Sequence, residues 1–297
     1  MSDTPASLRH KIASAGELES VVRTMKAMAA SCIGQYENAV RSLDDYDRTV
    51  QLGLVACFGH HVAPGDVRRD VRRGDAVTGA VVFGSDQGLV GAFNDAMAAF
   101  VADALRALPG RKVVWAVGER VRSRLDDAGF TPDAVFGVPH SINAVTPLVG
   151  RILEEVETLR ERGGLDEVYL FHHRPDGASG HAPMRQRLLP LDAQWRHDLT
   201  VRRWPTQALP QVLNARPGTL RAFVREYLFV SLFRACAESL ASENASRLSA
   251  MQRAERNIGE LLDELGQVFH RQRQRGIDEE LFDVVSGFEA LSPAFGG

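Results

Sequence analysis

Proline is missing from two long stretches of this chain, one near each end. The sequence has 297 residues and 13 prolines, yet none lies within residues 6–63 or within residues 218–292. Proline removes a backbone donor and breaks the interior of a helix, so each terminal stretch could form one uninterrupted helix. A helix of about 55 residues would be roughly 80 Å long. Because that exceeds what one globular core needs, each helix should pair with the other along most of its length.

Several other features are scarce. The three cysteines, Cys32, Cys57 and Cys236, are far apart, which favours small buried residues in a reducing compartment over a disulfide or metal framework. No run approaches the roughly 18 apolar residues of a membrane span, and the N-terminus lacks the apolar core of a signal peptide. The net charge of −3 argues against nucleic-acid binding, which usually requires a basic domain. We therefore expect neither a direct membrane span nor a nucleic-acid partner.

The terminal stretches show helical periodicity. Apolar positions in the first stretch recur in steps of three and four, a mean period of about 3.5 that is typical of a coiled-coil seam, and those in the second fall close to one face. In the first stretch they are Leu8, Ile12, Ala15, Leu18, Val22, Met25, Ala29, Ile33, Tyr36, Val40, Leu43, Tyr46, Val50 and Leu54. Thr4 and Pro5 predict a helix start, while Ser286 and Gly287 predict the end of the second helix. The alternative is a pair of core helices in an ordinary bundle.

The middle of the chain alternates between strand and helix patterns. The expected strands are 80–83, 112–117, 167–171 and 184–191, and the expected helices are 92–108, 120–128 and 144–162. This order predicts a small, partly parallel sheet covered by helices. The expected fold is α/β: a long antiparallel two-helix coiled coil built from both termini, with a small Rossmann-like α/β domain inserted. The expected segments are 1–60 (helix), 61–78 (linker), 79–200 (α/β domain), 201–217 (linker) and 218–297 (helix).

A glycine-containing loop follows the first expected strand. Gly84, Gly88 and Gly91 have the spacing GxxxGxxG, which could hold a phosphate at a helix N-terminus. However, no acidic residue ends the next strand and no P-loop lysine is present. We interpret the loop as a structural turn in which Ser85 and Asp86 cap the following helix, and we expect no cofactor.

Histidines offer a possible metal site. His60–His61, His172–His173 and His181 could supply ligands, but adjacent histidines on a strand point to opposite faces. A turn signal follows directly after His173. We expect these histidines to be solvated loop residues, with no metal bound. Because no nucleophile and base pair can be assembled, the sequence predicts no active site.

The chain resembles the gamma subunits of F-type ATP synthases along its whole length. The C-terminal stretch carries most of the resemblance, with ESLASE at 238–243 followed by Arg247, Ala250, Met251, Ala254 and Asn257, and then Arg273, Gln274, Ile277, Glu280, Leu281, Ser286 and Gly287. The sequence TMK at 24–26 resembles the family's N-terminal AMK motif. SDQGLVGAFN at 85–94 is similar to its SDRGLCGGLN loop, and Leu188–Leu191 match its fourth strand.

Some positions depart from the family pattern. Asp278 stands where the family usually has threonine, Gly276 where it often has serine, and Gln87 where the loop has arginine. These departures suggest a divergent member, or one from an alternate complex. The coupling ion, proton or sodium, stays open because the membrane ring selects it.

The resemblance implies a rotor role. Such a shaft stands inside a hexamer of alpha and beta subunits, with an epsilon subunit and a membrane c-ring as further partners. It biases each catalytic subunit differently and does no bond chemistry itself, so it would be a non-catalytic part of a larger enzyme. It would lie peripherally at the cytoplasmic face of a bacterial cell membrane. A stand-alone nucleotide-binding α/β protein and a coiled-coil tethering protein are the alternatives.

Six residues are candidates for subunit contact. They are Met25, Lys26, Arg247, Arg273, Gln274 and Asp278. Met25 falls on the seam and could simply pack there, and Lys26 should face outward, where it could equally be solvated. Arg247 could instead pair within the coil. The last three have helical spacing and, by the resemblance, would face the catalytic subunits.

Overall fold

The computed structural model describes residues 4–60, 76–176, 180–201, 204–208 and 217–291. These residues fall into two compact units. One contains Met1–Met28 with Ser249–Gly297, and the other contains Ala29–Leu248. We refer to them as the helical unit and the α/β unit. Helices α1 (Pro5–His60) and α6 (Pro217–Leu291) contribute residues to both.

Each terminal stretch forms the single long helix predicted from the absence of proline. Helix α1 begins at Pro5 as predicted, with the Thr4 hydroxyl accepting the N–H of Ser7 at 3.3 Å. The predicted end of the second helix is wrong, because α6 continues through Ser286 and Gly287. Glycine weakens a helix interior only by about 1 kcal/mol, so it does not enforce a stop.

The α/β unit is built on a five-stranded sheet in the order β3-β2-β1-β4-β5. The strands are β1 (Val77–Phe83), β2 (Arg111–Val117), β3 (Ala134–Phe136), β4 (Glu167–Asp176) and β5 (Gly180–Leu189). All neighbours run parallel except β4 and β5, which form an antiparallel pair. The first four strands follow the order of a Rossmann half. The predicted fold class is confirmed, and the short strand β3 is an addition.

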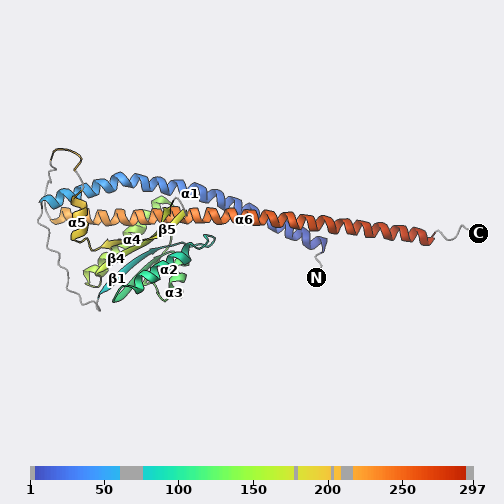
Figure 1. Cartoon of the computed structure of the whole chain (residues 1–297), viewed down its shortest axis with the longest axis horizontal. Helices are drawn as coiled ribbons and strands as arrows, with labels where there is room; N and C mark the ends of the chain where they lie inside the picture. The colour runs from blue at the N-terminus through green and yellow to red at the C-terminus, as the bar shows by residue number, and fades with distance from the viewer. Residues whose placement is uncertain (1–3, 61–75, 177–179, 202–203, 209–216, 292–297) are drawn as a thin grey trace, which may run out of the picture. The chain divides into compact units, whose positions relative to one another are not determined.

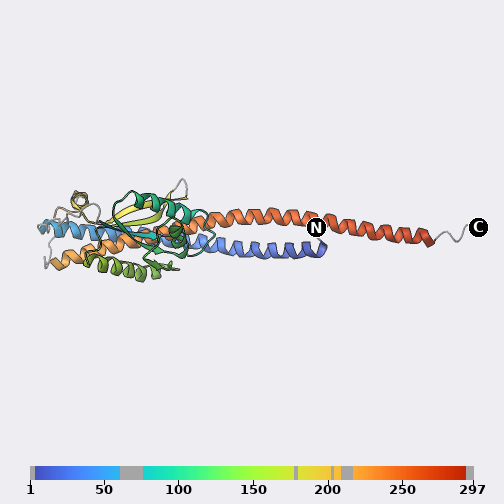
Figure 2. The ribbon, with the colours of Figure 1, turned by 90° about the horizontal axis from the view of Figure 1, so that it is seen from below.

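Helices cover both faces of this sheet (Figures 1 and 2). One face packs on α2 (Phe93–Arg106) and α3 (Glu119–Asp127), and the other on α4 (Val145–Glu161) and α6. Side chains alternate along β1, so Val81 and Phe83 join the second core while Ala80 and Val82 join the first. A 3-10 turn (Ile142–Ala144) and helix α5 (Ala193–Thr200) complete the described elements.

Helix α6 is deeply buried where it crosses the sheet. Nine consecutive residues, 235–243, are all buried, which is about two and a half turns of helix. Small side chains dominate this segment, among them Ala235, Cys236, Ala237, Ala241 and Ser242. Because every side of the helix is covered here, α6 forms part of the core of the α/β unit.

Two expected seam positions are exposed. Leu18 is 59% exposed and Tyr46 is 46% exposed, so the prediction that they lie on the seam is wrong. A strict 3.5 period drifts from the 3.6 residues of a straight helix, and the buried side of α1 near Leu18 is set by Ala15. The Tyr46 hydroxyl instead donates to Glu226 at 2.6 Å. None of the helices in the described ranges carries an apolar stretch long enough to cross a bilayer.

Candidate subunit-contact site

The helical unit pairs the start of α1 with the C-terminal part of α6 in antiparallel fashion. Lys26 contacts Glu255, whereas Arg9, earlier in α1, lies over the ring of Phe269, later in α6, at 5.3 Å. This order of contacts is what two antiparallel helices require. The pairing positions the first two candidate residues, Met25 and Lys26.

Lys26 does not face outward. Its ammonium lies 2.5 Å from the Glu255 carboxylate, and its side chain is only one-third exposed. The prediction was wrong because a lysine beside the seam can reach across it with its long apolar stem. Met25 is half-buried beside Lys26, and Met28 one turn further on is 63% exposed.

Arg273, Gln274 and Asp278 are exposed on α6 in the described part of the helical unit. Gln274 and Asp278 lie one helical turn apart, as their spacing indicated. Their proposed contacts with other subunits stay a prediction, as does the proposed contact of Met25.

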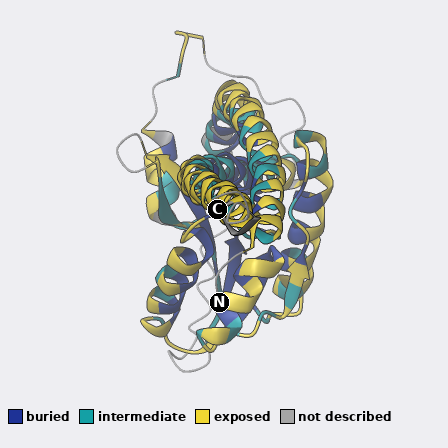
Figure 3. Cartoon of the chain, turned by 90° about the vertical axis from the view of Figure 1, so that its right-hand side faces the viewer, coloured by how far each residue is buried: buried dark blue, intermediate teal, exposed yellow. Residues whose placement is uncertain are grey.

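The end of α6 carries a second feature that the sequence analysis missed. Large apolar side chains there are between about half and three-quarters exposed: Ile277, Leu281, Phe282, Val284, Val285 and Phe288. They lie beyond Phe269, where Arg9 contacts α6, and the red end of the helix runs on past the start of α1 in Figures 1 and 2. Figure 3 shows this part of α6 as exposed.

Large apolar side chains exposed together on one stretch of helix are typical of an interaction site. The signal was present in the sequence, because Leu281–Phe282, Val284–Val285 and Phe288 interrupt an otherwise charged segment. The family resemblance pointed instead to the polar residues Arg273, Gln274 and Asp278. We define the six exposed apolar residues named above as the apolar tip.

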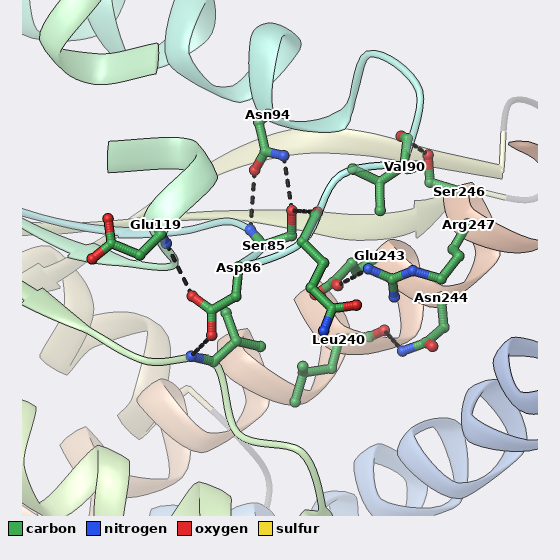
Figure 4. Close-up of polar contacts among 12 residues, drawn as sticks. Ser85, Asp86, Val90, Asn94, Glu119, Leu240, Glu243, Asn244, Ser246 and Arg247 are labelled. Atoms are coloured by element: carbon green, nitrogen blue, oxygen red, sulfur yellow. Dashed lines mark hydrogen bonds and ion pairs between the residues drawn. The ribbon is translucent and has the colours of Figure 1, made fainter. Parts of the chain in front are cut away.

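Arg247 lies in the α/β unit and pairs within its own helix. Its guanidinium is 2.7 Å from the carboxylate of Glu243, one turn earlier (Figure 4). Burial raises the pKa of Glu243, while the neighbouring Arg247 opposes that rise. The pair is nearly buried, with side-chain exposures of 13% and 7%, so Arg247 has little surface left for another subunit.

The glycine loop is tied into the fold by its own polar groups (Figure 4). The Ser85 N–H donates to the Asn94 side chain at 3.0 Å, and Asn94 donates back to the Ser85 hydroxyl at 2.8 Å. Ser246 of α6 donates to the carbonyl oxygen of Val90. Gly84 is required, because an added Cβ would meet Val121 at 2.3 Å. These internal bonds describe a turn that docks on α6.

The predicted capping of α2 by Ser85 and Asp86 is wrong. Helix α2 has no side-chain cap, and Asp86 instead accepts the N–H of Glu119 at the start of α3, at 3.0 Å. Its other carboxylate oxygen accepts the N–H of Val138 at 2.8 Å. The β1 and β2 strands end side by side, so a loop residue after β1 reaches the helix that follows β2.

The expectation of solvated histidines is wrong for His172 and His173. His172 and His173 are buried in β4, because the strand continues past the turn signal at Arg174–Pro175 and pairs with β5. They point to opposite faces, as adjacent strand residues must. His172 lies 2.9 Å from Glu238 of α6, and His173 lies 2.9 Å from the carbonyl oxygen of Phe93. His61 is outside the described residues.

Comparison of the sequence with known proteins identifies the family of this chain. The model for the family described as ATP synthase matches residues 4–291. The chain belongs to the ATP synthase family. An ATP synthase gamma chain of Glaesserella parasuis is 27% identical over 309 residues, which cover 96% of this chain and 98% of that one. Gamma chains of Moorella thermoacetica and Herminiimonas arsenicoxydans are 26% and 28% identical with the same coverage.

Solved ATP synthase structures share the fold. The Euglena gracilis mitochondrial ATP synthase rotor in rotational state 1 matches with a TM-score of 0.61 at 15% identity, over 92% of this chain and 98% of that one. The OSCP/F1/c-ring structure of the same enzyme in state 3 matches with a TM-score of 0.65 at 16% identity, over 99% and 96%. The resemblance found in the sequence is thereby confirmed at the level of the ATP synthase family and its gamma chains.

Proposed function

We propose that this chain is the central rotor shaft of an F-type ATP synthase, coupling ion flow through a membrane ring to synthesis or hydrolysis of ATP. The observation that carries the proposal is end-to-end similarity. Bacterial ATP synthase gamma chains align over 96% of this chain and 98% of their own lengths. The helices, the α/β domain and the order between them therefore all correspond.

The shaft would act by unequal contact. A hexamer of alternating alpha and beta subunits would surround the end of α6, and each catalytic subunit would meet a different side of that helix. A difference in contact free energy between sides biases each subunit toward a different nucleotide state. The apolar tip and the exposed Arg273, Gln274 and Asp278 are the surface that would make those contacts. Catalysis of phosphoryl transfer would stay with the surrounding subunits.

The α/β unit would make the remaining subunit contacts. In this proposal it meets the epsilon subunit and the c-ring, and the complex lies peripherally at the cytoplasmic face of a bacterial cell membrane. The bacterial origin of these gamma chains supports this setting.

The alternatives make different predictions. A stand-alone nucleotide-binding protein would bind ATP or NAD tightly by itself, and a tethering coiled coil would form a stable homodimer. The loop geometry does not favour nucleotide binding, because the Ser85 and Asp86 groups near the glycines already have internal partners. A rotor role accounts for the exposed apolar residues at the end of α6, because the surrounding subunits would contact them.

Co-purification tests the proposal. An affinity tag on the α/β unit should recover alpha, beta and epsilon subunits together with ATPase activity from detergent-extracted membranes. In the recovered complex, a probe attached near Arg185 of β5 should rotate in one direction when ATP is added. A tagged chain that elutes alone as a homodimer, or that binds ATP at micromolar concentration without partners, would contradict a rotor role.

A further inference from the structure

His173 and His181 bring two imidazole nitrogens face to face in the α/β unit. Their Nδ1 atoms are 3.2 Å apart. In the β4–β5 register His173 lies opposite Pro183, and His181 lies opposite Pro175. The two histidines are therefore diagonal neighbours on the same face of a strand pair. Paired strands, rather than a loop, fix their separation.

Hydrogen bonding determines which nitrogen of His173 carries the proton. Its Nε2 is 2.9 Å from the carbonyl oxygen of Phe93, which can only accept. Nε2 therefore donates, and Nδ1 of the neutral ring presents a lone pair toward His181. A backbone carbonyl that holds the far N–H is the usual way in which a metal-ligating histidine is oriented.

Burial favours the neutral form of both rings. Burial lowers the pKa of His173 to about 4, and burial also lowers the pKa of His181. Neutral imidazole is the form that binds a metal ion, because the ligating nitrogen must be unprotonated. The adjacent His172 points to the opposite face toward Glu238 and takes no part.

The separation of the two nitrogens fits one bound ion. Zinc–nitrogen bonds are about 2.0–2.1 Å long, so an ion bonded to both Nδ1 atoms would subtend an angle of about 100°. That angle is close to tetrahedral, whereas linear coordination would need the nitrogens about 4 Å apart. In the zinc-bound form His181 would carry its proton on Nε2 and present the lone pair of Nδ1 to the ion.

We propose that His173 and His181 form a binding site for a divalent ion of the zinc type. Within the described ranges no group of three His, Cys, Asp or Glu is arranged around a metal position, so water completes the coordination and the affinity is modest. The Phe93 ring covers one side of the site. Its centroid lies 4.0 Å from that of the His173 ring and 5.4 Å from that of the His181 ring. Bound zinc would join β4 to β5 and so brace the hairpin, which the hydrogen bond from His173 to Phe93 already links to the start of α2.

Zinc titration of the full-length, chelator-stripped chain tests this site. Calorimetry should show one zinc ion per chain, and the melting temperature should rise with zinc concentration because the ion binds the folded state. His181→Gln should weaken zinc binding at least tenfold. Two matched controls, His10→Gln at an exposed position of α1 and His61→Gln in the other sequence-adjacent pair, should keep the wild-type affinity. Unchanged binding in His181→Gln, or loss of binding in His61→Gln, would overturn the proposal.

A second measurement does not depend on any variant folding. In the wild-type chain labelled with ¹⁵N at its nine histidines, zinc should shift the Nδ1 resonances of two rings and leave the other seven in place. The His173 Nε2–H signal should persist, since that proton is held by Phe93. Shifts confined to Nε2, or shared among other rings, would show that zinc binds elsewhere.

Discussion

Lys26 of α1 and Glu255 of α6 form an ion pair across the two helices of the helical unit, with Nζ and Oε2 2.5 Å apart. Arg23 approaches the same carboxylate at 3.6 Å. The hydrogen bond from Lys26 is the main cause that lowers the pKa of Glu255. One carboxylate thus joins two cations of the facing helix, which links the helices by charge as well as by packing.

Neutralising this carboxylate should weaken the pairing modestly. Glu255→Gln should lower the melting temperature at neutral pH and low salt, and about 1 M salt should remove the difference because exposed ion pairs are screened. A carboxyl group with a lowered folded pKa stabilises above its ordinary pKa and loses that effect as the pH falls through the folded value. The variant and the wild type should therefore converge in acid. Glu260→Gln, exposed on the same helix, is the control, and a deficit that survives high salt would indicate lost packing instead.

Two glycines of α1 should respond in opposite ways to alanine. An added Cβ at Gly53 would meet the ring of Phe223 at 2.3 Å, whereas nothing lies within 4 Å of one at Gly34. Gly53→Ala should therefore lower the free energy of unfolding by about 1–3 kcal/mol through overpacking. Gly34→Ala should raise it by up to about 1 kcal/mol through helix propensity. Denaturant unfolding of the two variants checks this pair, and equal effects would mean that α1 and α6 are not closely packed at Gly53.

Acid should destabilise the α/β unit through His173. Its pKa is lowered from 6.5 to about 4 by burial, so the unfolded chain binds the extra proton first as the pH falls. Stability should be full above about pH 6.5 and decline toward pH 4, by at most about 3 kcal/mol from this residue. His181, on the same face, should add to the decline because burial lowers its pKa too.

The slope of the unfolding free energy against pH separates the protonation of His173 from a loss of stability that the substitution causes at every pH. His173→Gln should flatten the slope between pH 6.5 and 4, whatever its stability at neutral pH, and His270→Gln, exposed on α6, should leave it unchanged. An unchanged slope in His173→Gln would assign the acid response to other groups, such as His181.

The end of α6 should matter for turnover and not for folding. Substitutions at exposed positions usually change stability by less than about 0.5 kcal/mol. Replacing Arg273, Gln274 and Asp278 together with alanine should leave the purified complex assembled while lowering its coupled ATP turnover. Leu281→Ser with Phe282→Ser, within the apolar tip, should have the larger effect if apolar contact dominates.

Rotation assays and gel filtration of the two variant complexes measure these outcomes separately. A complex that fails to assemble but turns over normally in the fraction that does assemble would make this end of α6 an assembly element.

Sequence patterns predicted the long elements because their signals are summed over many residues. The two terminal helices and four of the five strands were predicted, since proline content and apolar runs act over whole segments. Strand β3 has only three residues, too few for a periodic signal. Helix α5 was also not predicted, although Asp192 caps it by accepting the N–H of Trp195 at 3.0 Å.

Burial of single polar residues could not be predicted in the same way. The turn signal at Arg174–Pro175 suggested that the third predicted strand ended near His173, yet β4 continues because β5 pairs with it up to Asp176. Beyond Phe171, β4 no longer pairs with β1, so Pro175 removes no hydrogen bond from a central ladder. Likewise, the partner of Lys26 lies 229 residues away, and no local pattern identifies it.

The buried segment 235–243 of α6 has a mechanical consequence for the α/β unit. Small side chains on every side of the helix let the sheet and α1 close tightly around it, and no glycine interrupts the segment. A force applied to the surface of the sheet is therefore passed to α6 through packed atoms, with no hinge in between to absorb it. Twisting this part of the helix relative to the sheet would require unpacking the core, so the two must turn together.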